Sequence, residues 1–435
     1  MILRGNLSFD QGVNAKIARS KKKRGAFGHS EWVISLFLSG TILDYGGGFY
    51  VKHAVFSIAV IYLLTQRRAY TIWLHCLADL AIVILIPTII TMGHLILSPG
   101  AADFENILEQ LWGRIGSPSY FIFVPLIYFV GAERTANWFV VILTTLAMVT
   151  ILLILAHVIG MINIFEYTEF MVRHRLALFG TDTRAADLGI SSVGLPSFGA
   201  SQAFPVGFSL ALASHPVSAV ILAAAIILQI QRGQVLGLIF SLVLMLAQMR
   251  RMILVGLGKI PKVSRRAMKI IVLLVLLILA MGVTITFYMG DIISVLMHKY
   301  RLIISLQDES TLVRLGHIEG YWLYVKEAPL GLLWGFGPNA YFFNTVTGYP
   351  VFMTEMVILI YIFWYGWLYT TIFYAWIGFG LCSLLKHSRK PFDSALVTAL
   401  VVLLIIGNIN PVMFTPMSFF FLALVRARRF ELAIS

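Results

Sequence analysis

Arginine side chains carry the clearest candidate chemistry in this sequence. Arg232 stands in a short polar turn, 230–234, between two apolar runs, and Arg314 stands in a longer polar segment further along the chain. A guanidinium group holds a fixed positive charge and binds a phosphate or carboxylate through two parallel hydrogen bonds. In so short a turn, Arg232 indicates either a cation that snorkels to lipid headgroups or one that binds an anion.

Other cations accompany these two arginines in the polar segments. We expect a substrate-binding role for Lys52, Arg173, Arg175 and Arg184. Several converging cations suit a phosphate or pyrophosphate group, although each one taken alone is more often a solvated loop charge. The polar segments predicted below to lie on the outer side hold no Asp-x-Asp pair, so we expect the site to use no metal and no other cofactor.

The segment 308–326 predicts an amphipathic helix that carries Arg314. Helical spacing places four polar and aromatic side chains on one stripe: Arg314, His317, Tyr321 and Tyr324. Glu319 points about 140° away from Arg314 around the helix. The stripe is either an anion-binding face, on which Tyr321 and Tyr324 contact the substrate, or the side of a membrane-surface helix that lies at headgroup level.

The composition predicts that these segments belong to a membrane protein. Apolar residues make up 59% of the chain and charged residues only 12%, whereas a soluble domain carries roughly 25% charged residues. Several apolar runs reach the ~20 residues that cross a bilayer. We therefore predict an all-α, polytopic helical bundle of about twelve transmembrane helices. Their expected ranges are 32–49, 51–66, 70–97, 118–132, 137–163, 192–213, 216–231, 233–249, 268–289, 351–385, 393–407 and 414–425.

The distribution of charge predicts the orientation of these helices. Basic residues gather in alternate connecting segments, as the positive-inside rule requires, and this explains the net charge of +13 without nucleic-acid binding. We expect a cytoplasmic basic N-terminal segment at 1–31 and a single transmembrane domain at 32–435, with both termini cytoplasmic. The extracytoplasmic loops are then about 164–191 and 290–350, and the larger one joins the ninth and tenth helices.

The order of these features resembles that of the bacterial O-antigen polymerase (Wzy) and O-antigen ligase superfamily. The shared features are an Arg-small turn between adjacent helices, a large outer loop with an Arg-bearing helix, and a Pro-Leu…Gly-x-Gly segment at 329–337. The resemblance covers 190–385 by motif and the rest by topology. It implies an integral-membrane glycosyltransferase of the bacterial inner (cytoplasmic) membrane that takes undecaprenyl-pyrophosphate-linked glycan as donor and acceptor. Membrane lipids and a chain-length-regulating protein are the other implied partners, with no nucleic acid.

By the same likeness, Arg232 and Arg314 would bind the pyrophosphate and stabilise the charge that develops on it. Ligases of the superfamily carry a His shortly after the Gly-x-Gly segment, and this chain has none between Gly337 and the tenth helix, which favours a polymerase. The base for the attacking hydroxyl stays open among His317, Glu355, Glu319 and His174, in falling order. The alternative from another class is a flippase without chemistry of its own.

Overall fold

The computed structural model is built almost entirely of helices. It describes residues 28–44, 49–97, 116–158, 161, 173, 199–229, 232–254, 309–337, 340–351, 354, 356–387, 390–409 and 415–434. The elements, in chain order, are α2 (His29–Leu43), α3 (Val51–Thr65), α4 (Arg67–His75), α5 (Leu77–Leu80), the π-helical segment η1 (Ala81–Leu85), α6 (Ile86–Leu97), the 3₁₀ segment η2 (Pro118–Phe123), α8 (Val124–Val130), α9 (Ala132–Val158), the 3₁₀ segment η3 (Gly199–Ala203), α12 (Phe204–Ser214), α13 (Pro216–Gln229), α14 (Arg232–Leu254), α17 (Glu309–Glu327), α18 (Gly331–Trp334), β1 (Phe342–Phe343), β2 (Pro350–Val351), α19 (Val357–His387), α20 (Pro391–Ile409) and α21 (Pro416–Ile434).

Four stretches of the described chain are long and apolar enough to cross a membrane. They are Leu77–Ile96, Ala132–Ala156, Val357–Lys386 and Pro391–Asn408. Shorter apolar helices accompany them at Val51–Thr65, Pro118–Val130, Pro216–Gln229 and Gly233–Ala247. The chain is therefore a helical protein compatible with several passes through a membrane. The expected count of about twelve spans stays a prediction, and the ninth predicted helix, 268–289, lies outside the described residues.

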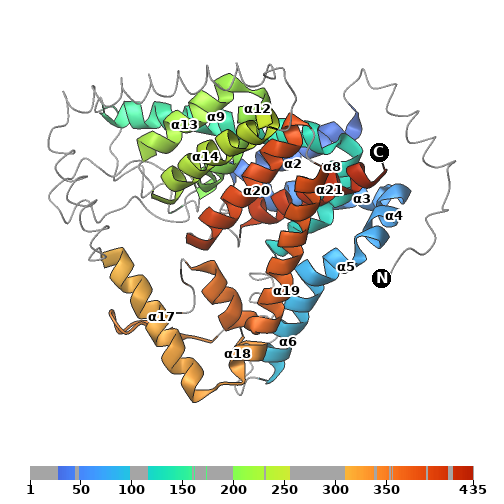
Figure 1. Ribbon diagram of the computed structural model, residues 1–435. Helices are drawn as coiled ribbons and strands as arrows, with labels where there is room; N and C mark the ends of the chain where they lie inside the picture. Colours follow the sequence, from blue (N-terminus) through green and yellow to red (C-terminus); the bar gives the residue numbers. More distant parts are fainter. Residues whose placement is uncertain are drawn as a thin grey trace.

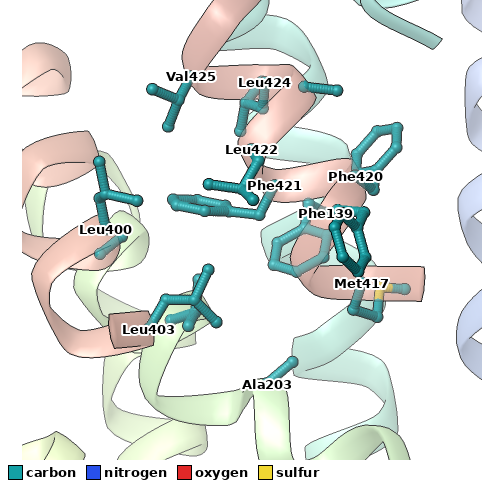
Figure 2. Packing of buried hydrophobic residues seen from close by; sticks show 14 of the residues in the cluster. Phe139, Ala203, Leu400, Leu403, Met417, Phe420, Phe421, Leu422, Leu424 and Val425 are labelled. Atoms are coloured by element: carbon teal, nitrogen blue, oxygen red, sulfur yellow. The ribbon is translucent and has the colours of Figure 1, made fainter. Parts of the chain in front are cut away.

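Much of the core lies where α9, α12, α13, α14 and α20 pack side by side and where α21 packs on α8, α9 and η2 (Figure 1). Small residues let backbones approach closely, as is common between membrane helices. A Cβ at Gly207 would lie 2.7 Å from a Leu143 methyl group, and one at Gly237 would lie 2.8 Å from the Pro205 side chain. Figure 2 shows Phe420 and Phe421 of α21 packed among other buried apolar side chains.

Two predicted long helices are interrupted in the structure. The predicted helix 70–97 is divided at Cys76, which has φ −103° and ψ 13°, and then passes through the π-helical segment η1. A π-helical turn shifts the backbone hydrogen-bond register, and the Tyr369 hydroxyl donates a 3.0 Å hydrogen bond to the Ile82 carbonyl there. The predicted helix 351–385 is α19, which is broken at Gly366.

Ion pairs gather where α2, α9 and α20 begin and α21 ends, and we name this the charged end. Arg134 pairs with Glu31. Arg428 contacts Asp393 at 2.6 Å and Glu431 at 2.8 Å. The second Glu431 oxygen accepts a 2.9 Å hydrogen bond from the Ala132 amide, which places a negative charge at the N-terminus of α9. The charged end therefore joins four helix termini through complementary charges.

A separate layer covers the opposite end, which we name the loop end. It consists of α17, α18 and the antiparallel hairpin β1–β2, where Phe342 pairs with Val351. Figure 1 shows α17 and α18 below the main body of helices, beside α6 and the bottom of α19. This layer packs on α19 before its break, far along the helix from its C-terminus at His387.

Candidate functional site

The predicted amphipathic helix is α17, and its stripe faces the protein. Its bounds, Glu309–Glu327, differ by one residue from the predicted 308–326. Tyr321 is buried, and Arg314, His317 and Tyr324 are half-buried. Glu319 is exposed on another side of the helix, where it accepts a 2.7 Å hydrogen bond from the Thr345 hydroxyl. The predicted alignment is confirmed, whereas the role of the stripe in anion binding stays a prediction.

The hairpin packs closely on α17 at two glycines of that helix. Gly316 and Gly320 are one helical turn apart, and a Cβ at Gly320 would lie 3.0 Å from the Phe343 carbonyl carbon. The Asn344 side-chain amide donates a 2.8 Å hydrogen bond to the Val313 carbonyl, and the Thr345 amide donates to the Gly316 carbonyl at 3.3 Å. The two glycines therefore allow the hairpin backbone to lie in contact with the helix, where larger side chains would hold it away.

Aromatic rings join this layer to α19 around Phe363. The Phe363 ring centroid lies 5.1 Å from that of Phe342, 5.2 Å from Phe336, 5.6 Å from Tyr324 and 5.8 Å from Tyr321. The Tyr321 hydroxyl is buried and has no hydrogen-bond partner within the described ranges, and burial raises its pKa to about 12. Packing thus occupies both tyrosine rings, so a substrate contact at Tyr321 would have to use its hydroxyl.

The Gly-x-Gly segment, Gly335 to Gly337, docks on the break in α19. Gly366 has φ 79° and ψ 167°, a conformation that essentially only glycine adopts. The break frees carbonyl groups of the helix, and the Phe336 and Gly337 amides donate to the Phe363 and Trp364 carbonyls at 2.7 and 3.3 Å. Gly335 also has a positive φ of 83°. The segment therefore satisfies backbone groups that a broken membrane helix would otherwise leave unpaired.

The start of α14, at Arg232, lies at the same end of the bundle as this layer. The helix α20 begins at the charged end, because Asp393 pairs there with Arg428, and it therefore finishes at the opposite end. Near that finish, Ile406 packs against Gly237 of α14, and Asn408 accepts a 2.8 Å hydrogen bond from the Tyr374 hydroxyl of α19. Arg232 thus opens a helix on the loop-end side of the molecule.

The other predicted site residues are unevenly described. The backbone of Arg232 is described but its side chain is not, and Glu355, Arg175 and Arg184 lie outside the described residues. Arg173 is exposed. The Lys52 amide donates a 3.0 Å hydrogen bond to the Asp44 carboxylate. The structure accordingly brings Arg314, His317, Tyr321 and Tyr324 together on one helix. The roles of the remaining predicted site residues stay predictions.

Buried glutamines beside the Arg232 turn were not predicted. Gln229 is 6% exposed, and neither its amide nitrogen nor its amide oxygen has a hydrogen-bond partner in the described part of the chain. The Gln202 side-chain oxygen is also buried and has no partner among these described residues, and the neighbouring Ser201 hydroxyl accepts a 3.2 Å hydrogen bond from Gln234. Amides both donate and accept, which suits hydroxyl-bearing ligands. In the sequence, nothing about these glutamines distinguishes them from residues that make ordinary polar contacts between helices.

At the loop end, the groups available for chemistry are the Arg314 guanidinium, the His317 imidazole and the buried Tyr321 hydroxyl. Within the described ranges, no three His, Cys, Asp or Glu side chains gather as metal ligands would. Comparison with known proteins adds no assignment, because no family model, curated protein or solved structure matches this chain.

Proposed function

We propose that the protein joins undecaprenyl-pyrophosphate-linked glycan units at the outer face of the bacterial inner membrane, as a polysaccharide polymerase whose termini are cytoplasmic. The observation that carries the proposal is the inward-facing stripe of α17, on which Arg314 and His317 are half-buried at the loop end. The start of α14 at Arg232, on the loop-end side, supports it further. An ordinary surface helix would instead turn its charged residues to solvent.

In the proposed reaction, a sugar hydroxyl of one lipid-linked glycan attacks the anomeric carbon of another. The bond from that carbon to the lipid pyrophosphate breaks, and the pyrophosphate leaves with the electron pair. Arg314 and Arg232 would stabilise this growing negative charge more than they stabilise the bound substrate, which is what lowers a reaction barrier. The proton of the attacking hydroxyl passes to a base.

The structure favours His317 over Glu319 as that base. His317 lies one helical turn from Arg314 on the same half-buried stripe, and its ring meets the Phe342 ring edge-on at 6.3 Å. Glu319 is exposed and accepts its hydrogen bond from Thr345 on another side of α17. A base must lie within hydrogen-bond reach of the proton that it removes, and only His317 shares the face of Arg314.

The test is replacement of Arg314 with Ala and with Lys, followed by measurement of polymer length in cells and with purified protein on lipid-linked repeat units. We expect the Ala variant to lose long polymer and the Lys variant to recover part of it, because Lys keeps the charge but not the bidentate geometry. Lys326→Ala is the matched control, since it removes an exposed cation from the same helix. Normal polymer from well-expressed Arg314→Ala protein would refute the proposal.

A flippase is the second candidate, and the break at Gly366 inside the span Val357–Lys386 favours it. Discontinuous helices form substrate sites in many transporters. Joining of repeat units by the purified protein in detergent would identify a polymerase, because a flippase performs no bond formation. Transfer of the glycan to a different acceptor lipid, without chain growth, would identify a ligase-type enzyme instead.

A further inference from the structure

Two adjacent arginines of α21 have opposite electrostatic surroundings. Arg428 is 7% exposed, and its guanidinium contacts the carboxylates of Asp393 and Glu431. Arg429 follows it directly and is half-buried, yet its buried Nε atom has no hydrogen-bond partner among the residues that the structure describes. A guanidinium withdrawn from water without a compensating anion is strongly unfavourable. Among the described residues, Arg428 is thus paired with two carboxylates, whereas no ion pair is seen for Arg429, and its guanidinium can accept a further anion.

The carboxylate beside Arg429 is already engaged. Asp79 accepts a 2.5 Å contact from the Arg426 Nε atom on one oxygen and a 2.7 Å hydrogen bond from the Trp376 indole on the other. Arg426 also donates to the His75 carbonyl at 3.3 Å. Among the described residues, Asp79 is near both guanidinium groups, and of the two it forms an ion pair with Arg426. The cluster keeps an excess of one positive charge.

A small cavity lies beside these two arginines, lined also by Trp376 and Gly380. Gly380 leaves room there, because a Cβ at this position would lie 3.6 Å from the Arg429 Nη1 atom. The Arg429 guanidinium also lies over the Phe379 ring, 5.0 Å from the centroid, and Phe379 is 66% exposed. Arg429 therefore contacts both a cavity and an exposed aromatic ring.

The depth of this cluster matches that of lipid phosphates. Asp79 is the third residue of the candidate span Leu77–Ile96, and Gly380 precedes the end of the span Val357–Lys386 by six residues. Six helical residues correspond to about 9 Å along the axis. Headgroups flank the hydrocarbon core at this depth, and basic pockets between transmembrane helices bind acidic lipid headgroups.

We propose that Arg429, assisted by Arg426, binds the phosphate of an anionic membrane phospholipid whose acyl chain lies over Phe379. The excess positive charge matches the ligand, and the exposed aromatic ring offers a hydrocarbon contact that a free phosphate ion would not use. This site lies away from the loop end and does not depend on the proposed polymerase activity.

The experiment uses the full chain purified in detergent, with native mass spectrometry and thermal unfolding in the presence of phosphatidylglycerol, phosphatidylethanolamine or inorganic phosphate. The wild type is expected to retain phosphatidylglycerol in preference to the zwitterionic lipid and to unfold at a higher temperature with it. Arg429→Gln is expected to bind phosphatidylglycerol about ten-fold more weakly, the order expected from loss of a charge-assisted contact. Without lipid it should be at least as stable as the wild type, because it no longer buries an unpaired cation.

Two further variants distinguish lipid binding at this site from a general effect of the positive charge of the protein. Arg68→Gln removes an exposed cation from α4 and should bind phosphatidylglycerol like the wild type. Gly380→Leu keeps every charge but fills the space beside Arg429, and it should bind as weakly as Arg429→Gln. Undiminished phosphatidylglycerol binding by Arg429→Gln would overturn the proposal. Equal stabilisation by inorganic phosphate would overturn the lipid assignment in favour of a soluble anion.

Discussion

Replacement of Gly366 by Ala should detach the loop-end layer from α19. The backbone at Gly366 has φ 79° and ψ 167°, and an added Cβ would lie 2.5 Å from the Leu333 carbonyl carbon and 2.6 Å from the Gly335 amide nitrogen. Both neighbours are backbone atoms, which do not move aside as the end of a flexible side chain does. The segment Gly335 to Gly337 would have to withdraw from the helix.

Two effects contribute to the loss of stability in Gly366→Ala. Holding an alanine in this backbone conformation costs of order 1–3 kcal/mol. Withdrawal of the segment also breaks the hydrogen bonds from the Phe336 and Gly337 amides to α19, each contributing about 1 kcal/mol net. Together these effects predict a loss of roughly 3–5 kcal/mol in the free energy of unfolding of this region.

The assay is thermal unfolding in detergent, combined with limited proteolysis of the segment 328–356. Gly378→Ala is the matched control, because it lies in the same helix and a Cβ there meets nothing within 4 Å. The control should be neutral or slightly stabilising, since alanine favours helix over glycine by about 1 kcal/mol. If Gly366→Ala unfolds and is cleaved like the control, the docking of the Gly-x-Gly segment on the broken helix is wrong.

Tyr321→Phe should leave the protein equally stable or stabilise it by about 1 kcal/mol, because the hydroxyl is buried and no described residue is its hydrogen-bond partner. Shortened polymer from this stable variant would mark the hydroxyl as a substrate contact. The pKa of Tyr321 is raised from 10.0 to about 12, so the contribution of its neutral form to stability is complete below pH 10 and is lost as the pH rises through 12. Equal alkaline denaturation of wild type and Tyr321→Phe would contradict this. Arg428→Leu should destabilise the protein by about 3–5 kcal/mol in chemical denaturation, because it strands the buried Asp393 carboxylate; Arg428→Leu combined with Asp393→Asn should recover part of that loss, and no recovery would count against the ion pair as the cause.

Much of the helical architecture is predictable because hydrophobic periodicity is local. The range 51–66 predicts α3 at Val51–Thr65, and 308–326 predicts α17 at Glu309–Glu327. The spacing on α17 also predicts which side chains share a face, since rotation by about 100° per residue is a property of any α-helix. In the described part of α17, Glu319 accordingly faces away from the half-buried Arg314.

The interruptions of the helices were not predictable from local sequence. Gly366 stands inside an apolar run, and an isolated glycine there is compatible with an unbroken helix. What determines the break is a segment about thirty residues earlier in the chain, whose backbone occupies the place of a helical turn. The ion pairs were not predictable either, because Arg426 and Asp79 are 347 positions apart and are brought together only by the folding of the whole chain.

The two ends of the bundle are held by different forces, and this separates their responses to change. The charged end joins helix termini through buried carboxylates and guanidiniums, so loss of one partner leaves an uncompensated charge and weakens the whole bundle. The loop end is joined by glycine contacts, aromatic rings and backbone hydrogen bonds around Phe363 and Gly366. Side-chain size is what disturbs such contacts, and the disturbance stays local. A glycine substitution at the loop end can therefore alter the layer that carries Arg314 while the charged end and the helices that it joins stay folded. This end is the better place to separate effects on activity from effects on folding.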